Sequence, residues 1–174
     1  MKRFDLQFPI DGQVIEELSA GDRVSISGRI LCGRDAVLPR LAQMVKDRSI
    51  QKLNIALEGG LIFHTAVSVA GVGPTSSNKI EIESTMEILS AAGIKMHLGK
   101  GELSSKTIKS LLDNHSVYAV IPPVTALLSE RIRDKRVIAF EELGMEALFE
   151  LTVENYPAVV AVARGESIYD RAII

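Results

Sequence analysis

The sequence predicts an α/β domain with a mixed, largely parallel central sheet and a second, smaller sheet. Two observations favour this class. Strand and helix patterns alternate through the middle of the chain, which is typical of parallel strands covered by helices, and both ends carry β patterns of their own. A chain of 174 residues is long enough to bury a core within one domain, so we assign residues 1–174 to a single domain.

The first half of the chain contains two strand patterns, each followed by a helix pattern. Residues 22–32 alternate apolar and polar side chains, the period of a half-buried strand. Residues 34–47 change to helical spacing, with Asp35 placed to cap the helix. The apolar run 59–71 is typical of a strand buried on both faces, and residues 79–93 predict a helix that a glycine ends.

The second half alternates more regularly. It contains short strand patterns separated by helix patterns, in the order strand 94–98, helix 104–115, strand 117–123, helix 124–132 and strand 136–140. Serines precede the helix pattern at 104–115 and predict its cap. Residues 147–163 form two β runs around the tetrapeptide ENYP, which predicts a hairpin or a return strand.

Composition excludes several classes of function. The net charge of -2 and the absence of a Lys/Arg block give no footprint for nucleic acid. No apolar run is long enough for a membrane span, and the first residues lack the apolar core of a signal peptide. The single cysteine, Cys32, excludes a disulfide framework and a thiolate metal site within the chain. We therefore expect a soluble cytoplasmic domain.

Three polar clusters fall where strands give way to helices, the usual place for a ligand in an α/β sheet. Each combines glycine with a cation or hydroxyls, which suits an anion: residues 32–39 (CGRDAVLP), 71–79 (GVGPTSSNK) and 98–104 (LGKGELS). Arg34 has the planar fork that matches a carboxylate, but it could equally be a surface arginine beside a capping Asp35. Lys100 lies between two glycines and is either a ligand contact or a solvated lysine in a turn.

Residues 71–79 do not match a nucleotide-binding loop. No glycine precedes Lys79, as a P-loop requires, and Ser76 occupies the place of the third glycine in a dinucleotide fingerprint. What remains is a glycine–proline turn that leads Thr75 and Ser76 into a helix start. These hydroxyls and the free N–H groups of the first turn suit a carboxylate or a phosphate, and simple N-capping is the alternative.

The histidines and the cysteine give little evidence of catalysis. His64 and His97 lie in apolar runs and are expected to be hydrogen-bonded core residues, while His115 lies at a helix end. None shares the spacing of metal ligands with another, and no G-x-S-x-G elbow is present. Cys32 is expected to be a small buried residue.

Taken in order, the clusters resemble a known family. Residues 20–41, the segments GVGPTSS and GKG, and residues 141–162 resemble the β subunit, or C-terminal half, of class I iron–sulfur fumarate hydratases and L(+)-tartrate dehydratases. The resemblance covers roughly residues 14–163. It implies a swivelling three-layer β/β/α domain, a 4Fe–4S cluster held by a separate α subunit in a hetero-oligomer, and an active site formed between the two subunits. The single cysteine agrees, because one thiol cannot hold such a cluster.

The resemblance also implies roles for individual residues. Arg34 of the G-R-D motif would bind a substrate carboxylate, Thr75 of G-P-T would take part in proton transfer at the substrate carbon, and Lys100 of G-K-G would contact the substrate. Gly73, Ser76 and Lys79 are expected to complete the substrate site. The chain departs from the family at Lys79, where an arginine is usual, at Leu38, where a histidine is common, and in the shorter apolar segment before G-P-T, in which His64 could take a polar role.

The sequence therefore predicts a β subunit of a hydro-lyase that interconverts fumarate and malate, with tartrate or another hydroxy-dicarboxylate as the alternative substrate. Two other classes stay open. Lys79 and Leu38 are compatible with a non-catalytic binding module of the same fold, and the glycine-rich clusters with an enzyme that binds a phosphate ligand without a partner.

Overall fold

The computed structural model describes residues 1–68, 71–76, 79–121 and 129–170. Its strands are β1 (Arg3–Phe8), β2 (Arg23–Gly33), β3 (Leu61–Ser68), β4 (Gly71–Thr75), β5 (Met96–Gly99), β6 (Val117–Val120), β7 (Ile132–Ala139), β8 (Leu148–Ala163) and β9 (Glu166–Ser167). Its α-helices are α1 (Gly12–Glu17), α2 (Leu38–Lys46), α3 (Lys79–Ala91) and α4 (Ser105–Asp113), and its 3₁₀ helices are η1 (Ile50–Leu53) and η2 (Glu141–Glu146).

The centre of the sheet is parallel and closes into a ring. Strands β2, β3, β5 and β6 pair in parallel in that order. Strand β8 runs antiparallel to β6 and also to β2, so these five strands form a closed, barrel-like ring. Within the described residues all nine strands connect into one network, because β1, β4, β7 and β9 each pair with a ring strand. The predicted α/β class and parallel centre are confirmed, and in the described residues the terminal strands pair into the same network as the ring.

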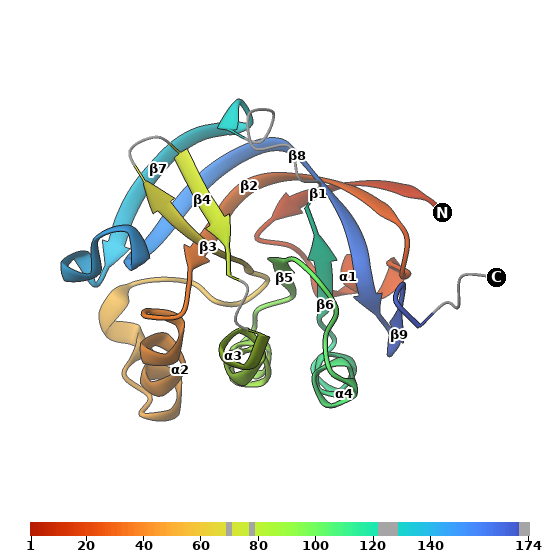
Figure 1. Ribbon diagram of the computed structural model, residues 1–174, viewed down its shortest axis with the longest axis horizontal. Helices are drawn as coiled ribbons and strands as arrows, with labels where there is room; N and C mark the ends of the chain where they lie inside the picture. Colours follow the sequence, from red (N-terminus) through yellow and green to blue (C-terminus); the bar gives the residue numbers. More distant parts are fainter. Residues whose placement is uncertain (69–70, 77–78, 122–128, 171–174) are drawn as a thin grey trace.

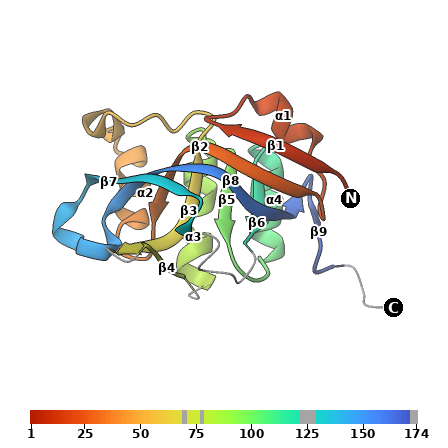
Figure 2. The same ribbon diagram turned by 90° about the horizontal axis from the view of Figure 1, so that it is seen from above.

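Helices cover one side of the ring. Figure 1 shows α2, α3 and α4 side by side beneath β3, β5 and β6, and in the view from above in Figure 2 the same three helices lie behind the strands. Apolar side chains of these helices share core clusters with outward-facing strand residues, Leu41 and Leu89 with Ile62 in one cluster and Met86 and Leu111 with Tyr118 in another. Short helix α1 packs elsewhere, with Ile15 in the other core.

The main core lies on the opposite face of the same strands, inside the ring. It takes alternate residues from all five ring strands, for example Ile26, Phe63, Leu98, Ala119 and Val160, each at most 1% exposed. Alternation follows from the pleat, which sends successive side chains to opposite faces. Because both faces of β3 are covered, its residues from Leu61 to Val67 are buried, as the apolar run predicted.

Most predicted elements are present within two to four residues of their expected bounds, and three expectations need correction. Residues 148–163 form one continuous strand, β8, so the hairpin alternative is wrong, while the return-strand alternative agrees with its antiparallel pairing to β2 and β6. Residues 71–75 form strand β4 against β3, where a turn was expected. Asp35 does not cap α2, whose N-cap residue is Val37 without a side-chain hydrogen bond. The helix predicted over 124–132 falls mostly outside the described residues.

Candidate functional site

The end of β4 brings the G-P-T segment against the buried strand β3. Thr75 and Thr65 are register partners, and the Thr65 hydroxyl donates to the carbonyl of Gly73 at 2.8 Å. Just beyond the strand, the backbone N–H of Ser76 donates to the carbonyl of His64 at 3.0 Å. A Cβ on Gly73 would lie 3.1 Å from the carbonyl oxygen of Ala66, so glycine permits the close approach of the two strands. Thr75 is half-buried and directly precedes Ser76.

A pocket of about 380 Å³ opens beside this segment, at the carboxyl end of β5. Its described lining includes Ser76, Lys79 at the start of α3, and Lys100 in the loop after β5, so residues from two predicted clusters meet here. Both lysines are exposed, whereas Ser76 is 2% exposed. Glu83 and Glu102 also line the cavity, so its charge is mixed, and the two cations and the hydroxyl are the groups in it that suit a small anionic ligand.

The loop that carries Lys100 is packed closely on Tyr118. A Cβ on Gly99 would lie 2.7 Å from the Tyr118 hydroxyl oxygen, so only glycine fits directly before Lys100. The Tyr118 side chain is fully buried, and its hydroxyl has no hydrogen-bond partner among the described residues. Burial raises the pKa of this hydroxyl, which keeps it protonated as a donor. Tyr118 also lines the pocket, and it was not singled out from the sequence because it reads as an ordinary core strand residue.

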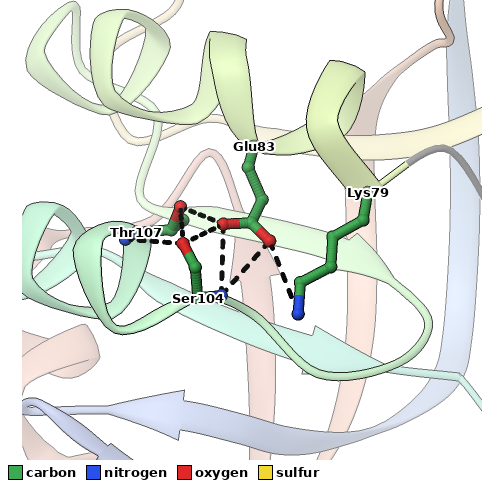
Figure 3. A network of polar contacts seen from close by, with 4 residues as sticks. All are labelled: Lys79, Glu83, Ser104 and Thr107. Carbon is green, nitrogen blue, oxygen red and sulfur yellow. Dashed lines mark hydrogen bonds and ion pairs between the residues drawn. The ribbon is translucent and has the colours of Figure 1, made fainter.

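A carboxylate on α3 holds the start of α4 (Figure 3). Glu83 accepts from the backbone N–H of Ser104 at 3.1 Å and from the hydroxyls of Ser104 and Thr107. The Lys79 ammonium lies 3.9 Å from the same carboxylate. Ser104 caps the helix, as predicted, with its hydroxyl accepting from the N–H of Thr107. The anion-binding end of α4 is therefore occupied by the protein's own Glu83.

The first predicted cluster joins the second through Asp35. The buried Ser76 hydroxyl donates to the Asp35 carboxylate at 2.7 Å, although the two residues lie 41 positions apart. The neighbouring Arg34 has its Nε 3.4 Å from the carboxylate of Glu146 in η2. Arg34, Gly73 and Thr75 are not among the described residues that line the pocket, whereas Ser76, Lys79 and Lys100 are. Ser76 thus links the pocket to the turn that carries Arg34.

Two buried histidines lie beneath the same segment. His64 Nε2 and His97 Nδ1 are 3.0 Å apart, and His97 Nε2 lies 3.0 Å from the hydroxyl of Ser90 in α3. Burial lowers the pKa of His64 to about 4, partly offset by the charge of Asp35, and burial together with His64 lowers the pKa of His97. Both rings are neutral at pH 7, so the expectation of hydrogen-bonded core histidines is confirmed.

No group of three or more His, Cys, Asp or Glu residues is arranged to hold a metal ion in the described part of the chain. The Cys32 thiol is fully buried in the main core, and burial raises its pKa, which disfavours the thiolate form that ligates metals. These residues do not fit a 4Fe–4S cluster. Among the described residues, no helix is long and apolar enough to cross a membrane.

Comparison with known proteins gives consistent relatives. A family model described as Fumarase C-terminus matches residues 1–172. The chain is 31% identical over 171 residues to a protein named putative L(+)-tartrate dehydratase subunit beta from Methanocaldococcus jannaschii, covering 90% of this chain and 86% of that one. It is 24% identical to the L(+)-tartrate dehydratase subunit beta of Escherichia coli K12, covering 90% of this chain and 81% of that one.

Longer proteins match as well. The chain is 30% identical over 178 residues to a putative fumarate hydratase class I from Geobacillus stearothermophilus, covering 95% of this chain but 33% of that one. This chain therefore spans most of the length of the β subunits and about a third of the longer fumarate hydratases. The resemblance inferred from the three clusters is confirmed.

Proposed function

Because this chain belongs to the Fumarase C-terminus family, we propose that it is the β subunit of a heteromeric hydro-lyase that adds water to fumarate to form malate. The pocket lined by Ser76, Lys79 and Lys100 is the observation that carries this proposal. A four-carbon dicarboxylate bears two negative charges, and the pocket offers two ammonium groups and a hydroxyl, beside the carboxylates of Glu83 and Glu102, at the carboxyl end of a parallel sheet.

In the proposed reaction this chain binds and orients the substrate. Lys100 binds one carboxylate in the pocket, which Lys79 and Ser76 complete. Arg34 and Gly73 are not among the described residues that line the pocket, and in this proposal Arg34 binds the other carboxylate from the adjoining turn while Gly73 allows the backbone to approach. Removal of a proton next to a carboxylate builds negative charge on that carboxylate, and cations already in place stabilise it. Thr75 would take part in proton transfer at the reacting carbon. A threonine hydroxyl is a weak base at neutral pH, so a group of the partner subunit or a water has to assist it.

We propose that a separate α subunit holds the 4Fe–4S cluster, since the residues of this chain do not fit one. The exposed side chains of Lys79 and Lys100 support an active site completed by a second surface, because cations stabilise charge best when water is excluded. In this proposal the chain is a swivelling three-layer domain that closes on its partner. A cytoplasmic location suits the free thiol of Cys32, because thiols stay reduced there.

L(+)-tartrate is the second candidate substrate. The length of this chain favours it, because the chain covers 86% and 81% of two relatives named as tartrate dehydratase β subunits. Lys79 bears on the choice. A lysine keeps the charge of the family's usual arginine but loses its bidentate fork, so the carboxylate or hydroxyl that it contacts is held less rigidly.

The test is to co-express the chain with a candidate cluster-bearing α subunit, to reconstitute the cluster without oxygen, and to assay fumarate hydration and L(+)-tartrate dehydration. We expect a stable complex that acts on one of the two. Lys100→Ala should lower kcat/KM at least a hundredfold, because one transition-state contact is worth roughly 3 kcal/mol. Lys46→Ala, at another exposed lysine, should change it less than twofold.

Two results would contradict the proposal. The absence of any complex, with no activity on either substrate, would remove the hydro-lyase assignment. A fully active complex whose kcat/KM is unchanged by Lys100→Ala and by Arg34→Ala would show that the chain is a non-catalytic module.

A further inference from the structure

A second pocket, of about 480 Å³, lies away from the candidate site and shares none of its described lining residues. It is bordered by β1, β2 and β8 and by the end of β6. Three arginines line it, Arg3, Arg23 and Arg131, together with the polar side chains Ser25 and Asn155. No aspartate or glutamate is among its described lining residues.

The sheet itself brings two of these arginines together. Arg3 begins β1, Arg23 begins β2, and the two are register partners in a parallel pair. Register partners project from the same face of a sheet, and neighbouring strands lie about 4.8 Å apart. Like charges held side by side in this way are destabilising unless something compensates them. Arg131 adds a third charge from beside β8, where its carbonyl accepts from the N–H of Glu154 at 2.9 Å.

Nearby carboxylates do not compensate this charge. In the described part of the chain, Arg3, Arg23 and Arg131 have no carboxylate within ion-pair distance. The carboxylate of Asp22 is engaged by the backbone N–H groups of Lys2 at 2.7 Å and Ser19 at 3.0 Å. Asp5 shares the face of Arg3 on β1, two residues away, without lining the pocket.

The adjacent arginines behave differently. Arg133 Nε lies 2.7 Å from Glu154 Oε2, and Arg136 Nη2 lies 2.8 Å from Glu150 Oε1. In the described residues, the exposed arginines of the neighbouring strand β7 are therefore paired with carboxylates, whereas the three arginines that line the pocket are not. Val24 and Ile121 also line the pocket, and the side chains of Arg3 and Arg23 are exposed to solvent.

We propose that this pocket binds a small organic polyanion whose phosphate or carboxylate groups bridge Arg3, Arg23 and Arg131. The guanidinium fork pairs with either oxyanion through two parallel N–H···O bonds, and three forks suit a ligand with at least two such groups. Ser25 and Asn155 supply further polar contacts at its edge. This site is independent of the proposed hydro-lyase activity, because it uses none of that site's residues.

The test is calorimetric titration of the 174-residue chain at low ionic strength with two probes, inorganic pyrophosphate and citrate. Binding of pyrophosphate alone indicates a phosphate ligand, binding of citrate alone a polycarboxylate, and either supports the site. Arg23→Gln and Arg131→Gln should each weaken binding at least tenfold. The control Arg133→Gln removes a paired arginine nearby and should change affinity less than twofold.

Lys100→Ala separates this pocket from the candidate active site. If the probes bind here, that variant leaves their affinity unchanged, and the amide signals of Ser25 and Asn155 shift in NMR spectra on titration. The proposal is overturned if neither probe binds, or if Lys100→Ala or Arg133→Gln weakens binding as much as Arg23→Gln does. None of these measurements depends on hydro-lyase activity, so each proposal can fail without the other.

Discussion

At the scale of single residues, the candidate site depends on polar groups that are buried directly beneath it. The carbonyl of His64 fixes the N–H of Ser76, and Asp35 accepts from its hydroxyl at 2.7 Å. The ring of His64 lies within hydrogen-bond distance of the ring of His97, and the His97 ring in turn lies within hydrogen-bond distance of the Ser90 hydroxyl. Buried polar groups are costly unless they are hydrogen-bonded, so this chain of contacts holds Ser76 in one position.

The histidine pair gives a prediction about pH. Burial lowers the pKa of His64 from 6.5 to about 4, so the unfolded chain binds more protons than the folded one between these values. Stability contributed by the neutral ring is fully present above pH 6.5 and is lost as pH falls toward 4, by roughly 3 kcal/mol for His64 alone. The pKa of His97 is shifted in the same direction and adds to this loss.

NMR titration of the imidazole signals checks this directly. The His64 and His97 signals should show no protonation between pH 8 and pH 5. A midpoint near 6.5 for either buried ring would contradict the structure.

The same residues show how far a sequence can predict a site. The three clusters could be recognised because each follows a strand, and parallel strands end at one edge of a sheet. The bond between Ser76 and Asp35 could not, because it joins residues 41 positions apart and local spacing made Asp35 a plausible helix cap. Tyr118 and Glu83 were missed for a similar reason, since only their tertiary neighbours distinguish them from other strand and helix residues.

At the scale of elements, α3 and α4 are joined at the rim of the pocket by one carboxylate. Glu83, with a side chain 11% exposed, receives the N–H and hydroxyl of Ser104 and the hydroxyl of Thr107 (Figure 3). This contact fixes the C-terminal end of the loop that carries Lys100. The loop's other end is fixed by Gly99 on Tyr118.

Glu83→Gln should therefore destabilise the chain and loosen this loop. The substitution removes the negative charge of the side chain, although the N–H and hydroxyl of Ser104 still need an acceptor. We expect the free energy of unfolding, measured in urea, to fall by about 1–3 kcal/mol. The matched control is Glu87→Gln, one turn further along α3 at an exposed position, which should change stability by less than about 0.5 kcal/mol. Equal effects of the two substitutions would show that the contact in Figure 3 adds nothing to stability.

Strand β8 shows why an element can be misjudged from its sequence. The tetrapeptide ENYP carries the composition of a turn, and Asn155 indeed has a left-handed φ of 52°. In the fold this residue forms no hairpin, because β2 continues to pair on both sides of it with a register shift between Ile26 and Gly28. The bend lets one 16-residue strand pair with β7 at its start and with β6 at its end. Pairing on two sides outweighs the local turn preference.

At the scale of the whole molecule, the closed ring explains why the sheet is a single unit. Strand β8 returns to β2 and β6, so each ring strand has a neighbour on both sides and the main core is enclosed by all five. Phe63 lies in this core with no exposed surface, and its ring meets that of Tyr156 edge to face, with centroids 5.9 Å apart. The contact joins β3 to β8 across the interior of the ring.

Phe63→Ala tests whether the ring unfolds as one cooperative unit. Removal of a fully buried phenylalanine should lower the free energy of unfolding by about 3–5 kcal/mol, from lost burial and the cavity left behind. If the ring is cooperative, hydrogen exchange of slow amides should accelerate by the same factor in β2, β3, β5, β6 and β8, including strands that Phe63 does not touch. Ile80→Ala, at a side chain 82% exposed, is the control and should leave both measurements unchanged. Acceleration confined to β3 and its immediate neighbours would mean that the strands open separately, and that ring closure by β8 does not bind the fold into one unit.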